Sequence, residues 1–512
     1  MDRRQFISRT VGVGVALAFS AMNFRTVNAA DLPADITDMS ASMLSVAIKK
    51  RYVSCVDVMQ AYLDRIHRYN PTYNAIVSMV EDDVLLQQAA IADRELDKGE
   101  YRGWMHGMPH AVKDSKDVKG MPTSKGSPIF AGTIADDDNI VVARIRRQGP
   151  IFIGKTNLPE FGMGSQTYNP VFGVTGCAYD PDLTAGGSSG GAACGLGTRM
   201  LPVADGGDLM GSLRNPGAFN NVIGFRPTQG RVPRRGRWDG DLFYQQMGVD
   251  GPMGRSAEDT ARLLHSISGY STEEPLSLRD DLPSPDSFAA TKLKKLKIGW
   301  MGDYNGYLAT EPGVLDVCEA SLQTIAEHGA IVEPCQPGYD MDRLWQTWLA
   351  LRHWARHGMR VLYNDPATRK LLKPEAVWEI EESFGTSAEQ IYKAGIARAD
   401  WFRALRDLFD RYDFLVVPTA QVFPFSKDIH WPTEINGRKM DTYHRWMEVV
   451  IGGTLAGVPV VNVPAGFDSQ GRPMGMQVMA PHGRDWQALE FALAYEQVTD
   501  HLERRPEMVE RI

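Results

Sequence analysis

The sequence predicts an α/β protein whose loops carry the chemistry. Two capped helix starts are visible, one at residues 54–57 (SCVD), followed by apolar residues at every fourth position, and one at residues 256–259 (SAED). Between them, over residues 106–233, short apolar runs such as 151–153 and 222–225 alternate with glycine-rich turns. This texture is typical of strands joined by functional loops. At 512 residues, the chain is long enough for one large α/β unit.

The C-terminal half continues the same alternation of helices and strands. The polar stretch 271–287, with three prolines, indicates a surface connection, and residues 297–300 (KIGW) return to strand texture. An aromatic-rich helical region follows over residues 342–409. Residues 414–417 (FLVV) predict a buried strand, which Pro418 ends.

The composition is that of a soluble globular enzyme rather than a disordered or fibrous protein, with 43% hydrophobic and 23% charged residues. The formal net charge is -8, and it becomes about -11 once four arginines and one aspartate of the first 29 residues are left out. An acidic chain of this kind offers no electrostatic reason to bind a phosphate backbone. We therefore expect no nucleic acid as a partner.

Residues 1–29 are predicted to be a twin-arginine signal peptide, which leaves residues 30–512 as the mature domain. Residues 2–8 (DRRQFIS) resemble the twin-arginine export signature, an apolar run covers residues 11–19, and residues 27–29 (VNA) supply small residues for cleavage. The apolar run is too short to span a bilayer comfortably. The sequence thus predicts a periplasmic or secreted protein without stable membrane association after signal removal.

Two short motifs point to other enzyme classes but lack the required context. Residues 149–156 (GPIFIGKT) match the phosphate-binding loop letter for letter, yet the strand 151–153 lies between the two glycines instead of before the first. Residues 187–191 (GSSGG) match a nucleophile elbow centred on Ser189. The segment that precedes this motif is polar and turn-like, whereas an elbow follows a buried apolar strand.

A longer series of motifs accounts for almost the whole mature chain. These blocks, in this order and spacing, resemble the signatures of the amidase signature family: residues 107–114 (GMPHAVKD), 154–161 (GKTNLPEF), 186–191 (GGSSGG), 208–216 (DLMGSLRNP), 224–228 (GFRPT), 456–459 (AGVP), 463–467 (VPAGF) and 475–477 (GMQ). The resemblance implies a single α/β domain over residues 30–512, with a large mixed β-sheet flanked by α-helices on both faces. It also implies a reaction that requires no cofactor and no metal.

The resemblance assigns catalytic roles to three residues: Lys113 matches the family's lysine, Ser188 its bridging serine in a cis peptide, and Ser212 its nucleophile. A serine hydroxyl needs a neighbouring base, and a lysine can be that base only if burial lowers its pKa toward neutrality. Ser188 can relay a proton because a hydroxyl both donates and accepts. Taken singly, each of the three could be an ordinary turn or surface residue, but together they fall at the family spacing.

The turn before Ser212 is expected to form the oxyanion hole with the backbone N–H groups of Leu209, Met210, Gly211 and Ser212. Here the chain departs from the family pattern, because Met210 stands where a glycine is usual. Two interpretations follow: the side chain reshapes the pocket while the donors survive, or the donors are displaced and the site is crippled. We favour the first, since N–H donation needs no particular side chain.

Four further residues near these motifs are interpreted as structural. Asp208 and Arg214 are expected to form a buried pair beside the nucleophile. His106 and His110 lie close to Lys113, but they stand on an irregular, proline-containing segment that does not create one helical face for a metal.

The implied function is hydrolysis of a carboxylic amide through a serine acyl-enzyme, with esters or carbamates as further substrates. The expected partner is a small-molecule amide, and a homodimer is left open. Two alternatives remain. One is the glutaminase subunit of a tRNA amidotransferase, which the export signal argues against. The other is a catalytically inactive binding protein, which Met210 motivates.

Overall fold

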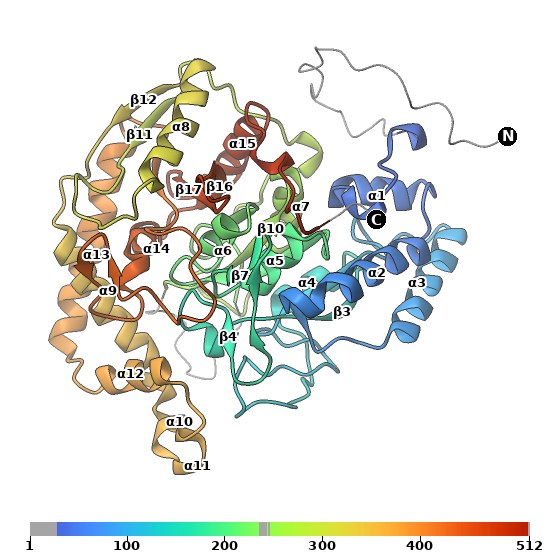
Figure 1. The fold of residues 1–512 in the computed structure, drawn as a ribbon, viewed down its shortest axis with the longest axis horizontal. Helices are drawn as coiled ribbons and strands as arrows, with labels where there is room; N and C mark the ends of the chain where they lie inside the picture. Colours follow the sequence, from blue (N-terminus) through green and yellow to red (C-terminus); the bar gives the residue numbers. More distant parts are fainter. Residues whose placement is uncertain (1–27, 235–242, 244–245, 510–512) are drawn as a thin grey trace.

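An eight-stranded sheet forms the centre of the molecule (Figure 1). The computed structural model describes residues 28–234, 243 and 246–509, so residues 1–27 of the expected signal peptide lie outside the described part. In spatial order the strands are β12 (Ile331–Pro334), β11 (Lys297–Trp300), β13 (Phe414–Pro418), β17 (Pro473–Met479), β16 (Val460–Phe467), β9 (Ile223–Arg226), β10 (Val249–Gly254) and β8 (Val203–Asp208).

This sheet is mixed. Strand β11 runs parallel to β12 and β13, whereas the other neighbouring pairs are antiparallel. All residues of β13 and β17, and all but the last of β16, are buried. Successive side chains of a strand point to opposite faces of the sheet, so a strand whose residues are all buried is covered on both faces. The predicted mixed sheet with helices on both faces, in one domain, is therefore confirmed.

Helices surround the sheet in Figure 1. Their bounds are α1 Ala41–Lys49, α2 Cys55–Tyr73, α3 Asp82–Asp97, α4 Ile140–Arg146, α5 Gly190–Gly197, α6 Arg214–Phe219, α7 Ala257–Ile267, α8 Val314–Glu327, α9 Met341–Arg356, α10 Arg360–Asn364, α11 Pro366–Arg369, α12 Pro374–Ser383, α13 Ala388–Phe409, α14 Ile451–Ala456 and α15 Asp485–Glu496. Helices α6 and α8 pack against β16 and β17, α7 packs against β10, and α9 packs against α13.

A smaller sheet brings a second set of residues to the same centre. It consists of β1 (Ile76–Val77), β3 (Ile151–Thr156) and β2 (Pro109–Lys113), in that order, and β2 runs parallel to β3. Strand β2 contacts β8 of the large sheet, and helix α5 contacts both. Short two-stranded ribbons complete the strands: β4 (Tyr168–Asn169) with β5 (Gly173–Val174), β6 (Gly176–Cys177) with β7 (Asp180–Thr184), and β14 (Glu434–Ile435) with β15 (Arg438–Lys439).

Most local expectations are met. The capping box at Ser54 begins α2, the Ser256 side chain caps α7, and the strands expected at residues 297–300 and 414–417 are β11 and β13. The helical region 342–409 is divided into α9 to α13 by short breaks.

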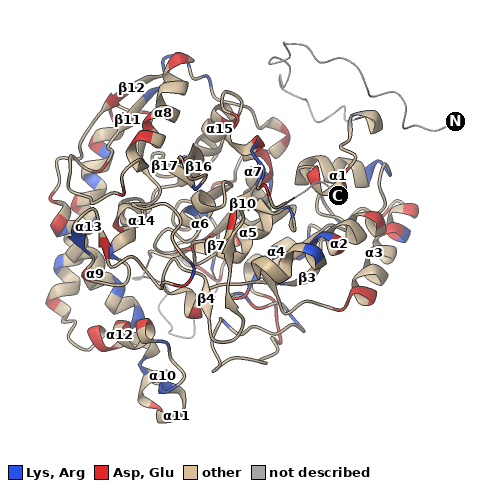
Figure 2. Cartoon of the chain, in the orientation of Figure 1, with Lys and Arg blue, Asp and Glu red and all other residues tan. Residues whose placement is uncertain are grey.

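The surface is charged but mixed in sign. Figure 2 shows basic and acidic residues interspersed along outer helices such as α2 and α3. Interspersed charge of this kind suits a solvated surface. Within residues 28–234 and 246–509, no helix is long and apolar enough to cross a membrane.

Candidate active site

The three residues that the sequence singles out lie at the junction of the two sheets. Lys113 is the last residue of β2, Ser188 lies two residues before α5, and Ser212 lies in the turn between β8 and α6. Because β2 contacts β8 and α5 contacts both strands, segments far apart in the sequence meet here. All three side chains are almost fully buried.

Lys113 and Ser188 are in direct contact. The Lys113 Nζ atom lies 2.8 Å from Ser188 Oγ and 2.8 Å from Ser189 Oγ. The Gly187–Ser188 peptide bond is cis, as the resemblance implies. Ser212 is joined to this group through the backbone, since the Ser189 N–H donates to the Ser212 carbonyl over 3.2 Å. Among the described residues, no hydrogen bond joins the hydroxyls of Ser188 and Ser212.

The surroundings of Lys113 favour its neutral form. Burial, and after it the nearby positive charge of Lys116, lower the pKa of the Lys113 amine from 10.5 to about 7, whereas Asp250, Asp205 and Asp208 act in the opposite direction. Burial disfavours the charged form because the ammonium loses its hydration. A substantial fraction of Lys113 is therefore uncharged near neutral pH, as a general base requires.

The turn before Ser212 is shaped by a buried ion pair. Asp208 accepts hydrogen bonds from the backbone N–H groups of Gly211 (3.0 Å) and Leu213 (3.2 Å). Arg214 in turn donates to both Asp208 oxygens, over 2.9 and 3.0 Å, and both side chains are fully buried. The expected structural pair is therefore present, and it fixes the backbone on either side of Ser212.

Glycine is required at position 211 but not at position 210. Gly211 has φ of +78°, and a Cβ atom there would lie 2.9 Å from Asn215 and from Val450. Met210 is outside the left-handed region, and its side chain is 3% exposed and packed in the main hydrophobic core. A methionine at this position is thus compatible with the local backbone, which favours the interpretation that the donors survive.

A buried charge cluster beside Lys113 was missed by sequence reasoning. Lys116 Nζ lies 2.9 Å from Asp205 and 3.3 Å from Asp250, and both carboxylates are buried in neighbouring strands, β8 and β10. Asp205 also lies 3.2 Å from His110 Nε2. Two lysines three residues apart in the sequence KDSK were the available signal, but nothing in the sequence shows that both would be buried.

The residues of the competing motifs have structural surroundings. The strand inside the phosphate-loop pattern is β3, and the fully buried Lys155 donates to the carbonyl of Lys116 and to Thr123 Oγ1. His106 Nε2 lies 3.0 Å from the carbonyl of Ala92. The segment that enters the elbow pattern includes β7, which pairs with β6 in a two-stranded ribbon.

One wall of the site is formed by the segment after β3. Gly162 has φ of +69°, and a Cβ atom there would lie 3.2 Å from Ser188 Oγ, so this backbone passes close to the serine. The adjacent Met163 is fully buried in a second apolar cluster, with Met359 and residues of α12. An apolar cluster therefore begins one residue after the glycine whose backbone approaches Ser188.

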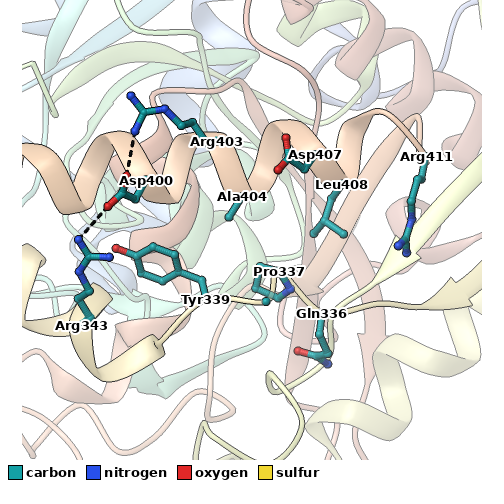
Figure 3. A pocket seen from close by; sticks show the side chains of 11 residues that line it. Gln336, Pro337, Tyr339, Arg343, Asp400, Arg403, Ala404, Asp407, Leu408 and Arg411 are labelled. Atoms are coloured by element: carbon teal, nitrogen blue, oxygen red, sulfur yellow. Dashed lines mark hydrogen bonds and ion pairs between the residues drawn. The ribbon is translucent and has the colours of Figure 1, made fainter.

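A separate groove of about 450 Å³ lies on the outer side of α13 (Figure 3). Asp400 bridges Arg343 and Arg403 there, each over 2.8 Å. The groove contains none of the site residues expected from the sequence. Its charges are exposed and largely paired, so it offers no reactive group.

Comparison with known proteins decides the family. A family model described as Amidase matches residues 57–489. The chain belongs to the amidase signature family. A member from Rhodococcus erythropolis, named acylamidase, is 31% identical, and the match covers 91% of this chain and 97% of that protein. A glutamyl-tRNA(Gln) amidotransferase subunit from Thermosynechococcus vestitus is also 31% identical, over 89% of this chain and 97% of that protein.

Two solved structures share the fold over nearly the whole chain. A bacterial aryl acylamidase of the amidase signature family superimposes with a TM-score of 0.84 at 26% identity, covering 91% of this chain and 98% of its own. A 6-aminohexanoate cyclic dimer hydrolase superimposes with a TM-score of 0.81 at 20% identity, covering 93% and 100%. This amidase signature protein is therefore an enzyme of the amide-hydrolase class.

Proposed function

We propose that this amidase hydrolyses linear carboxylic amides, to an acid and an amine or ammonia, with Lys113, Ser188 and Ser212 as the catalytic residues. One observation carries the proposal: the amine of Lys113 is buried, has a pKa of about 7, and lies 2.8 Å from the hydroxyl of Ser188. A buried, neutral lysine in contact with a serine is an activated base.

The steps follow from these positions. Neutral Lys113 takes the proton of Ser188, which takes that of Ser212, after a rotation of the Ser212 side chain between its staggered rotamers. Ser212 Oγ attacks the carbonyl carbon, and the tetrahedral intermediate collapses as the C–N bond breaks and the proton returns through Ser188 to the leaving nitrogen. Water then attacks the acyl-enzyme ester by the same route, which releases the acid and restores Ser212.

Backbone donors of the turn stabilise the oxyanion. The N–H of Gly211 donates to Asp208, so its contribution is to hold the turn, and we assign donation to Leu209, Met210 and Ser212. This assignment needs no particular side chain at position 210.

The substrate class follows from the wall of the site. The apolar cluster that begins at Met163, one residue after the glycine that approaches Ser188, supports an aryl or alkyl group in the substrate. Two similar proteins carry the names acylamidase and aryl acylamidase, which supports amides of this kind. Esters and carbamates are further substrates, because their carbonyls undergo the same attack.

The same proposal includes location and assembly. The twin-arginine pattern of residues 2–8 supports export to the periplasm or beyond, with small-molecule amides as partners and a homodimer left open. Export argues against the tRNA amidotransferase role that similar proteins carry, since tRNA charging takes place in the cytoplasm. The alternative of an inactive binding protein loses its motivation, because Met210 fits the turn without left-handed backbone.

Hydrolysis of p-nitroacetanilide, together with labelling by a fluorophosphonate, tests this function. Ser212→Ala should lose both the activity and the label. Ser189→Ala is the matched control, because Ser189 contacts Lys113 equally but is not the proposed nucleophile; it should still carry the label on Ser212. A label that disappears with Ser189 and persists without Ser212 would move the nucleophile to the elbow motif.

A further inference from the structure

We propose that Lys116, held between Asp205 and Asp250, is a positioning residue whose fixed positive charge acts together with burial to favour the neutral form of Lys113 and so helps to set the pH range of the enzyme. The inference rests on the proposed function, since it takes Lys113 to be the base. It assigns a role to a buried charge cluster that the catalytic steps do not use.

The contacts of Lys116 join three segments. Lys116 follows β2 and its Nζ atom lies 2.9 Å from Asp205 Oδ2 on β8, 3.3 Å from Asp250 Oδ1 on β10 and 3.0 Å from the carbonyl of Gly206. Lys113 Nζ lies 3.5 Å from the carbonyl of Gly207, the next residue of β8. The two amines therefore meet the same strand at consecutive residues.

The two lysines differ in what surrounds their amines. Burial acts to lower the pKa of Lys116, but the two carboxylates that face it raise that pKa overall, so Lys116 stays charged. The amine of Lys113 contacts two hydroxyls and a carbonyl but no carboxylate of residues 28–234 and 246–509, and burial lowers its pKa. A fixed ammonium near a second amine disfavours protonation of that second amine. Because their surroundings differ in this way, Lys116 carries the positive charge and Lys113 is the residue that can act as the base.

Other charged groups around Lys113 are held by partners of their own. Asp208 is paired with Arg214, and Asp250 is also 3.3 Å from Arg234. The titratable and charged groups on the elements packed around Lys113 are His110 of β2, Lys155 of β3, Asp205 and Asp208 of β8, Asp250 of β10, and Asp114 and Lys116 after β2. Among these, Lys116 is the cation that lowers the pKa of Lys113 most, and Asp250 is the anion that raises it most.

The inference therefore predicts that variants of Lys116 and of Asp250 move the pH at which activity rises in opposite directions. Lys116→Met removes the positive charge, so the rise of activity with pH should move to higher pH, by on the order of one pH unit. Asp250→Asn removes a negative charge while Asp205 still holds Lys116, so the same rise should move to lower pH. A loss of packing alone would lower activity at every pH and would shift neither curve.

The experiment measures the rate of fluorophosphonate labelling of Ser212, and kcat/KM for p-nitroacetanilide, from pH 5 to pH 10. Lys155→Met is the matched control: Lys155 is a buried lysine that braces the carbonyl of Lys116, so its loss loosens the same turn without removing the Lys116 charge. Circular dichroism checks each variant for folding. Lys155→Met should keep the wild-type midpoint of both pH curves.

The double variant Lys116→Met/Asp250→Asn decides the matter if the single Lys116 variant does not fold. The midpoint of its pH–activity curve must lie at higher pH than that of Asp250→Asn, since the two proteins differ only at position 116, where the double variant lacks the positive charge. Equal midpoints, or a shift of the same size in Lys155→Met, would overturn the inference. Wild-type labelling rates in Lys113→Ala would instead overturn the proposed function, which keeps the two failures distinct.

Discussion

Replacement of Lys113 by arginine separates a base from a structural charge. With a pKa of about 7, roughly half of Lys113 is neutral at pH 7, whereas a lysine at the ordinary 10.5 would be neutral in roughly one molecule in 3,000. The environment of Lys113 thus supplies about 10³-fold more base at neutral pH. An arginine keeps the positive charge but does not deprotonate in this range, so Lys113→Arg should lose on the order of 10³-fold or more in kcat.

The assay is kcat/KM for p-nitroacetanilide against pH, for the wild type, Lys113→Arg and Lys113→Ala. Wild-type activity should rise with a midpoint near pH 7, because the neutral amine is the active form. Both variants should be folded and inactive. If Lys113→Arg keeps more than roughly a tenth of wild-type activity, Lys113 is not the base.

The lowered pKa of Lys113 also makes the stability of the folded protein depend on pH. Between pH 7 and 10.5 the unfolded chain binds more protons at Lys113 than the folded chain, so wild-type stability rises with pH in this window. Below pH 7 the folded protein bears the full cost of the charged amine, on the order of 4–5 kcal/mol. Lys113→Met should therefore be more stable than wild type at pH 6, by an amount that shrinks toward pH 10. Urea unfolding at both pH values measures this, and a constant difference would contradict it.

Three further predictions concern the turn and the N-terminus. Arg214→Met removes the bidentate partner of buried Asp208 and leaves Arg226, 3.3 Å away, as its remaining cation, so the protein should lose about 3 kcal/mol in urea unfolding; a loss below about 1 kcal/mol would mean that the pair is not structural. Gly211→Ala places a Cβ in left-handed backbone 2.9 Å from its neighbours, so kcat should fall at least tenfold, and unchanged kinetics would show that the turn is not part of the site. Joint replacement of Arg3 and Arg4 by Lys should leave full-length protein in the cytoplasm on cell fractionation, and undiminished periplasmic activity would remove the export proposal.

Much of the fold could be predicted because local signals agree with the tertiary structure. Ser54 and Ser256 cap their helices as their sequence context indicates, and the apolar residues 414–417 form a strand buried on both faces. The order of strands could not be read from these signals. Neighbours such as β9 and β16 are more than 200 residues apart in the chain, and apolar periodicity does not encode which strands pair.

At the candidate site, the sequence predicted which motif residues would come together but not the buried charges around them. Lys113 and Ser188 meet as the motif spacing implies, and Asp208 pairs with Arg214. The roles of Lys116 and Asp250 could not be anticipated, because a lysine and an aspartate are usually exposed and 134 positions separate these two. Only the register of β8 with β10 brings Asp250 opposite Gly207 and into reach of Lys116.

A lysine can act as a base near neutral pH only if its surroundings lower its pKa, whereas a histidine needs no such change. Histidine titrates near neutral pH without help, whereas the pKa of a lysine base must fall from 10.5 to about 7. Burial alone would also lower the pKa of any neighbouring lysine. Lys116 nevertheless stays charged because its amine contacts two carboxylates, whereas the amine of Lys113 contacts two hydroxyls. A carboxylate in contact with the Lys113 amine would favour the charged form of that amine, so the contacts of Asp205 and Asp250 with the Lys116 amine matter as much as their charge. If Lys113 is the base, activity near neutral pH depends on Lys116, Asp205 and Asp250 as well as on the proposed catalytic residues.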